Sequence, residues 1–212
     1  MFPSQCRATW RANKLKQNQI NRSTTNLIDA VRNIFAAEVA KNRPSAPQLK
    51  RVLALMQELR LDPDRPDPSQ LPGCRHFSRT LDLAAGSAAE RVANALRELQ
   101  PTLAWAQNPR YNVDNMGADF MDNYGWSALG LTGSSAMAFG VLLLGPEITY
   151  PPTSYESEGV FLVIGGSPEW KCGDQPWERY EAGSIICRPY HGAEGKRPGK
   201  EPMLALYAWM YR

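Results

Sequence analysis

Apolar residues recur every three or four positions through most of the first hundred residues. This is the spacing of one buried face of an α-helix, and groups of Ser, Thr and Pro stand where such helices would begin or end. Three helices are predicted on this basis: one capped by Ser23-Thr24-Thr25 that ends near Ala40, one capped by Ser45 that ends before Asp62, and one that opens with the capping box Ser87-Ala88-Ala89-Glu90 and ends at Pro101.

From about residue 101 the pattern changes to short apolar or alternating runs, separated by Gly, Pro, Asn and Asp. Short runs at regular spacing predict strands of a sandwich or barrel. The expected fold class is therefore α+β, with a helical region over 1–100 and a β-barrel over 101–212. The predicted strands are 124–131, 136–144, 160–164, 177–180, 184–187 and 203–210.

Composition narrows the class of protein. The 212 residues are 43% apolar, which is enough for a sizeable core. The net charge of +3 is scattered along the chain, so nucleic acid is not an expected partner. No apolar run reaches the ~18 residues of a membrane span, and we expect a soluble, cytoplasmic protein. The four cysteines are far apart and are expected to be reduced thiols.

The first 28 residues contain five basic residues and no acidic one. Such a composition is shared by flexible basic arms and by targeting segments, and both readings stay open. We expect a flexible basic arm over residues 1–22.

The most informative stretch is 150–166, where a strand end and a polar turn precede an apolar strand closed by Gly165-Gly166. It has the outline of the first motif of a cupin barrel. Further motifs stand at 104–111 (AWAQNPRY), 120–125 (FMDNYG) and 142–146 (LLLGP). Together they resemble the cupin-type dimethylsulfoniopropionate (DMSP) lyases, in which helices precede a double-stranded β-helix, an antiparallel jelly-roll barrel.

The resemblance implies a carbon–sulfur lyase that splits DMSP into acrylate and dimethyl sulfide by β-elimination. It also implies a divalent metal such as Zn, Fe or Mn, because the charge that develops on the substrate carboxylate needs a cation. A homodimer formed through edge strands is a further reading that the resemblance leaves open.

The family's ligand positions are changed in this chain. A metal site needs about three imidazole, carboxylate or thiolate ligands, and the residues present cannot rebuild the usual one. A different set built from His191, Glu194 and either Glu158 or Cys187 stays open, beside the reading of His191 as an exposed loop residue. The family's histidine, glutamate, tyrosine and second histidine correspond to Tyr155, Gly159, Phe161 and a position at or beside Glu194, and an additional histidine corresponds to Thr153.

Two functions follow from these residues. In the first, the chain is a lyase-like enzyme that uses Tyr150 and Glu194 as catalytic groups. In the second, it is a metal-free, non-catalytic cupin whose aromatic box binds a sulfonium or quaternary ammonium carboxylate through cation–π attraction. Aromatic residues that only fill the barrel remain a third reading. The predicted ligand-binding residues are Tyr155, Phe161, Trp209, Trp126 and Glu158. Lys196 to Lys200 are expected to form a solvated basic loop, and a second reading, in which this loop lines the mouth of the barrel and attracts a carboxylate, stays open.

Overall fold

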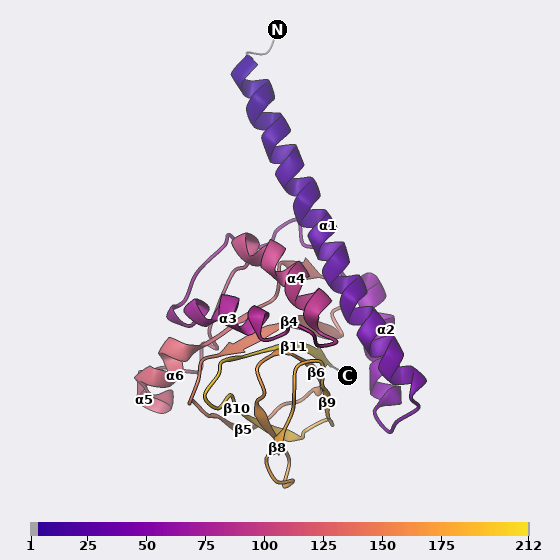
Figure 1. The fold of residues 1–212 in the computed structure, drawn as a ribbon, viewed down its shortest axis with the longest axis vertical. Helices are drawn as coiled ribbons and strands as arrows, with labels where there is room; N and C mark the ends of the chain where they lie inside the picture. The colour runs from indigo at the N-terminus through magenta and orange to yellow at the C-terminus, as the bar shows by residue number, and fades with distance from the viewer. Residues whose placement is uncertain (1–3, 212) are drawn as a thin grey trace.

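The computed structural model describes the backbone of residues 4–211 and the side chains from residue 14 onward, except that of residue 16. Helices occupy most of the first half of the chain, and the long first helix extends well beyond the body of the molecule (Figure 1). The helices are α1 Ser4–Ala40, α2 Ala46–Leu55, α3 Phe77–Asp82, α4 Glu90–Leu99, α5 Val113–Met116 and α6 Ala118–Asn123, with 3-10 turns at Met56–Glu58, Pro72–His76 and Gln100–Thr102.

The second half of the chain forms two antiparallel sheets that face each other. One sheet has the strand order β2-β4-β11-β6-β9 and the other β5-β10-β7-β8, while β1 and β3 form a separate pair. The strands are β1 Arg60–Leu61, β2 Tyr124–Ser127, β3 Leu131–Thr132, β4 Met137–Leu144, β5 Tyr150–Ser154, β6 Glu158–Gly165, β7 Glu169–Cys172, β8 Glu178–Arg179, β9 Ile185–Arg188, β10 Ala193–Arg197 and β11 Met203–Met210.

From β4 onward the chain passes back and forth between the two sheets. β4, β6, β9 and β11 belong to the five-stranded sheet, and β5, β7, β8 and β10 belong to the four-stranded sheet. Every pairing between these strands is antiparallel. This alternation is that of a cupin-like double-stranded β-helix, so the predicted fold class is confirmed.

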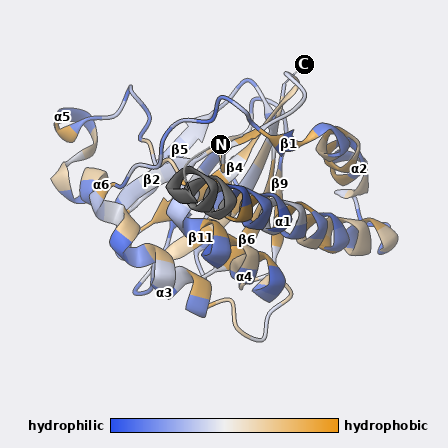
Figure 2. Cartoon of the chain, turned by 90° about the horizontal axis from the view of Figure 1, so that it is seen from above, coloured by the Kyte–Doolittle hydropathy of each residue, from blue (hydrophilic) through white to orange (hydrophobic). Residues whose placement is uncertain are grey.

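The helices cover the outer face of the five-stranded sheet (Figures 1 and 2). Side chains alternate along a strand, so each central strand contributes to two cores. On β11, Leu204 and Leu206 pack toward the helices, whereas Ala205 and Tyr207 belong to a second cluster inside the barrel. Because both faces are buried, these strands are apolar throughout.

The first helix is longer than predicted. It begins at Ser4, so residues 4–22 are helical rather than a flexible arm, and residues 1–3 lie outside the described part. Ser23 is buried in mid-helix, where its hydroxyl donates to the carbonyl oxygen of Gln19 at 3.0 Å and to the carboxylate of Glu98 at 2.6 Å. The predicted cap is therefore wrong, and Ser23 instead joins α1 to α4.

The other two helices lie close to their predicted positions. α2 begins directly after Ser45, although the Ser45 side chain makes no capping hydrogen bond. α4 begins at Glu90, whose carboxylate accepts from the backbone N–H of Gly86 at 3.2 Å.

The strand predictions fail at β10. Its residues Glu194, Gly195 and Lys196 carry no aliphatic side chain, so no hydrophobic pattern marks them as a strand, yet all three are buried. Lys196 is only 1% exposed, and its assignment to a solvated loop is wrong. The strand β7, which begins at Glu169, is also absent from the predicted strands.

None of the helices in the described part of the chain is long and apolar enough to cross a membrane. Of the cysteines whose side chains the structure describes, Cys74, Cys172 and Cys187 are free thiols.

Candidate ligand-binding site

A cavity of about 280 Å³ opens between the two sheets of the barrel. It lies near the lower end of the ~300–1,000 Å³ range of small-molecule pockets, so it suits a ligand of few atoms. Its lining is mainly aromatic, with one cationic side chain. The lining residues are Asn108, Pro109, Tyr124, Trp126, Ala138, Leu142, Tyr150, Tyr155, Lys196, Tyr207, Trp209 and Tyr211.

Three stacked rings form one side of this cavity, and we refer to them as the aromatic wall: Tyr155, Trp209 and Tyr207. The Tyr155 and Trp209 ring centroids are 5.4 Å apart with an interplanar angle of 23°. Trp209 and Tyr207 are 4.6 Å apart at 26°. Two of the rings come from alternate residues of β11, which point to the same face of the sheet. Ring faces carry negative potential and attract cations, and the Arg188 guanidinium carbon lies 5.3 Å from the Tyr155 ring centroid. Trp209 is stacked between the other two rings.

Hydroxyl groups link Tyr155 of the aromatic wall to two further tyrosines, Tyr150 and Tyr111. The Tyr150 hydroxyl lies 2.9 Å from that of Tyr111 and 2.7 Å from that of Tyr155. Burial is the main cause that raises the pKa of Tyr150 above its ordinary value, and it also raises the pKa of Tyr155. Both phenols are therefore protonated at neutral pH and act as hydrogen-bonding groups.

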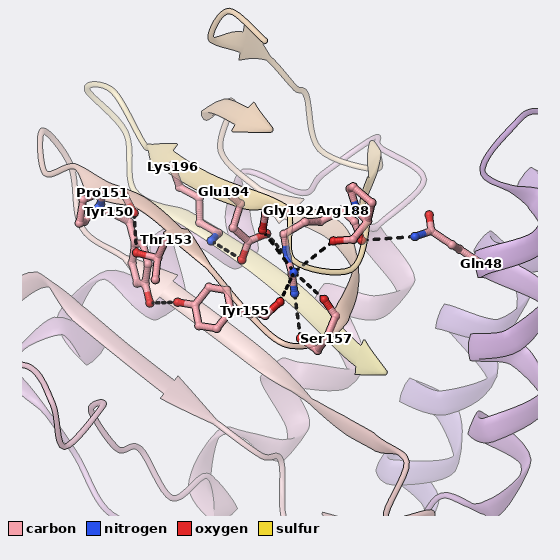
Figure 3. Close-up of polar contacts among 11 residues, drawn as sticks. Gln48, Tyr150, Pro151, Thr153, Tyr155, Ser157, Arg188, Gly192, Glu194 and Lys196 are labelled. Atoms are coloured by element: carbon pink, nitrogen blue, oxygen red, sulfur yellow. Dashed lines mark hydrogen bonds and ion pairs between the residues drawn. The ribbon is translucent and has the colours of Figure 1, made fainter. Parts of the chain in front are cut away.

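Three buried charged residues lie in a row inside the barrel, and we refer to them as the charge triad: Arg188, Glu194 and Lys196 (Figure 3). Of these, Lys196 lines the cavity. Glu194 Oε1 accepts from Lys196 Nζ at 2.9 Å, and Glu194 Oε2 lies 3.3 Å from Arg188 Nε. Glu194 and Lys196 are two residues apart on β10, so both side chains point into the barrel. One carboxylate between two cations leaves a formal net charge of +1.

Backbone and hydroxyl oxygens satisfy most of the Arg188 guanidinium. Its Nη1 donates to the carbonyl oxygen of Ser157 at 2.6 Å, and its Nη2 donates to the Ser157 hydroxyl at 2.9 Å. The carbonyl oxygen of Arg188 accepts from the Gln48 side chain of α2 at 3.3 Å. These contacts fix Arg188 at the end of β9, on the side of Glu194 away from Lys196 (Figure 3).

The Lys196 ammonium is enclosed by three rings. Its Nζ lies 4.6 Å from the ring centroid of Tyr150, 4.8 Å from that of Trp170 and 5.2 Å from that of Phe161. Burial lowers the pKa of Lys196 below its ordinary value, and the neighbouring Glu194 carboxylate opposes that effect. The rings and the carboxylate both favour the charged ammonium.

The structure brings most of the predicted site residues together. Tyr150, Tyr155, Trp126 and Trp209 line the cavity. Glu194 lies beside it through its bond to Lys196, and Phe161 packs against Trp170 with centroids 4.9 Å apart.

Glu158 and His191, like Phe161 and Glu194, are not lining residues. Glu158 forms an ion pair with Arg51 of α2 at 2.9 Å. His191 is exposed in the β9–β10 turn with a φ of +59°. Sequence reasoning also missed the roles of Lys196 and Arg188. The signal that could have found Lys196 is its two-residue spacing from Glu194.

The residues at the family's metal position do not fit a divalent cation. Glu194 already binds two cationic side chains, and Lys196 places a positive charge next to it. Phe161 offers no donor atom, and Tyr155 is a protonated phenol. Over the described residues, no group of three His, Cys, Asp or Glu side chains could hold a metal ion.

The fold and the cavity define a cupin-like barrel with an aromatic pocket and a built-in cation. The family model described as dimethylsulfoniopropionate lyase matches residues 44–205, so the chain belongs to the DMSP lyase family. A search of curated proteins gave no match.

Two solved structures share the fold over most of their length. The first, described as "DMSP lyases RdDddP and RnDddQII", is 21% identical, with a TM-score of 0.74 over 90% of this chain and 93% of that chain. The DMSP lyase DddQ from Ruegeria pomeroyi DSS-3 is 22% identical, with a TM-score of 0.65 over 86% of this chain and 91% of that chain. The resemblance seen in the sequence motifs is thereby confirmed.

Proposed function

We propose that the protein binds a small onium carboxylate, such as DMSP, in the barrel cavity without the help of a metal ion. The observation that carries this proposal is the pairing, in one cavity of about 280 Å³, of the aromatic wall with the Lys196 ammonium. A zwitterion of this class carries a sulfonium or quaternary ammonium group at one end and a carboxylate at the other. The wall attracts the onium end by cation–π interaction, worth about 0.5 to 2 kcal/mol per well-placed ring.

Ligand binding is proposed ahead of catalysis because neither predicted catalytic residue, Tyr150 or Glu194, is placed as an effective base. A base that takes a proton at neutral pH needs a pKa near that pH. The pKa values of Tyr150 and Tyr155 are raised instead, and Glu194 is held between two cations.

The lyase reaction is the second candidate, and family membership supports it. In that reaction Glu194, or Tyr150 after its phenol has first lost its own proton, accepts the proton from the carbon next to the carboxylate. The electron pair of that C–H bond forms the C=C bond of acrylate, while the C–S bond breaks and dimethyl sulfide departs with its bonding pair.

One experiment tests both candidates. Purified protein is incubated with DMSP at millimolar concentration, and both its melting temperature and the dimethyl sulfide in the headspace are measured. Binding raises the melting temperature by mass action, with about 2.7 kcal/mol of added stability at a hundredfold excess over Kd. Stabilisation without dimethyl sulfide supports the binding function, and enzymatic release supports the lyase. If no onium compound shifts the melting temperature, the binding proposal fails.

A further inference from the structure

The inner end of the cavity presents a cation from the protein itself. Lys196 lines the cavity, although its side chain is only 1% exposed. Glu194 and the rings of Tyr150, Phe161 and Trp170 hold the ammonium in place, so little side-chain entropy remains to be lost when a ligand binds.

The ammonium has spare donor capacity. A lysine ammonium carries three N–H donors. Glu194 Oε1 is the one acceptor recorded for Lys196 among the described residues. The rings around the ammonium supply electrostatic attraction but no conventional acceptor oxygen. A carboxylate that enters the cavity can therefore accept a charge-assisted hydrogen bond from Lys196.

Arg188 prevents Glu194 from cancelling this positive charge. The guanidinium lies against Glu194 Oε2 and is not part of the cavity lining. Its positive charge therefore neutralises the Glu194 carboxylate from the side away from Lys196. The surplus positive charge of the charge triad is thus presented to the cavity by Lys196. In a buried site this attraction is screened less than it would be in water.

We propose that the Lys196 ammonium, oriented by Glu194, binds the carboxylate of the ligand and takes the place of a divalent metal ion. This inference rests on the proposed function, since it names the protein group that binds the carboxylate of the onium carboxylate. The onium end then lies against the aromatic wall. Tyr150 connects the two ends, because its ring faces the ammonium and its hydroxyl bonds that of Tyr155 at 2.7 Å.

Two ligands of matched shape test the inference. The compound 3-(trimethylammonio)propanoate carries the carboxylate, and its primary amide replaces that group with a neutral one. Each is titrated by calorimetry into wild-type protein, Lys196→Met and Lys200→Met, with and without EDTA. Lys200 is an exposed residue beyond β10 and serves as the matched control.

The wild-type protein and Lys200→Met are expected to prefer the carboxylate by about tenfold or more, as for a hydrogen bond between charged groups. Lys196→Met is expected to bind both compounds about equally, with the affinity for the amide unchanged. EDTA is expected to change none of these values. Lys196→Met keeps the Arg188–Glu194 pair, and its circular dichroism and melting temperature report on folding; Lys196→Gln is the second variant if the first does not fold.

Other results overturn the inference. A carboxylate preference that persists in Lys196→Met or Lys196→Gln shows that another group binds the acid. A preference that EDTA removes assigns that role to a metal ion. If the wild-type protein binds both compounds equally, the inference fails while the proposed binding function stands. If it binds neither, both fail.

Discussion

The two faces of the five-stranded sheet are both buried but differ in chemistry. The face toward the helices is lined mainly by aliphatic side chains, such as Leu162 of β6 and Leu206 of β11. The face inside the barrel carries Phe161 and Tyr207 at the neighbouring positions of the same strands, and it surrounds the cavity. Of the charge triad, Arg188 ends β9 of this same sheet, whereas Glu194 and Lys196 face it from β10 of the four-stranded sheet.

This difference separates stability from the proposed ligand recognition within one sheet. Aliphatic packing against α1 and α4 leaves no polar group to satisfy, so it contributes mainly to stability. A buried ion network gains little net stability, because desolvation offsets the attraction between its charges. The inner face therefore keeps its charges at a cost, and that cost is consistent with a role in binding.

Glu194→Gln is expected to produce the largest effect, because it removes the one anion between two buried cations. Breaking a buried pair in this way costs about 3 to 5 kcal/mol of folding stability. Urea denaturation of the wild-type protein and the variant measures this loss of folding stability. Glu201→Gln is the matched control: Glu201 and its partner Arg79 are 46% and 53% exposed, and such a surface pair contributes little to folding stability. Equal losses in the two variants would contradict the role assigned to the charge triad.

Leu206→Ala tests the opposite face. Leu206 is fully buried under the helices, and its truncation is expected to cost about 2 to 5 kcal/mol with ligand affinity unchanged. Leu15→Ala on exposed α1, where the side chain is 69% exposed, should stay within about 0.5 kcal/mol of wild type. A change in ligand affinity for Leu206→Ala would show that the two faces are coupled.

Trp209→Leu weakens the aromatic wall without touching the charge triad. The loss of one ring is expected to reduce affinity for 3-(trimethylammonio)propanoate by a free energy of about 0.5 to 2 kcal/mol, measured by calorimetry. Trp177→Leu is the control, since Trp177 stacks on Arg197 at 3.9 Å and does not line the cavity. If both variants bind like wild type, the wall does not hold the onium group.

Removal of divalent metal ions by a chelator is expected to change neither the folding stability nor the ligand affinity of the protein. Extended dialysis against EDTA should leave the melting temperature and the ligand affinity unchanged, because the positive charge of the site comes from Lys196 and Arg188. A fall in either quantity, restored by one divalent metal, would contradict this prediction.

Patterns in the sequence predicted the long central strands well, because their side chains are apolar on both faces. The strands β4 and β11 lie within one residue of their predicted bounds. Motifs of the family also indicated the barrel, and they predict that Tyr155 and Gly159 replace two ligands and that Phe161 replaces a candidate base. These features depend on local pattern and on residue identity at fixed positions.

Other features appear only in the tertiary structure. Ser23 looks like a helix cap until Glu98 of α4 is seen beside it. Lys196 looks like a loop residue because the sequence around it is polar, and only the pairing of β10 with β5 and β7 buries it.

The sequence by itself thus determined the fold class and the family, and it predicted that the usual ligand set is changed. Only the tertiary structure decided what stands in the place of those ligands. Glu194 forms ion pairs with both Lys196 and Arg188, and Arg188 lies on another strand. The pairing of β10 with β7 places the Lys196 ammonium over the ring of Trp170. Such contacts join residues that are distant in sequence, and no local sequence pattern specifies which buried charged residues will form an ion pair.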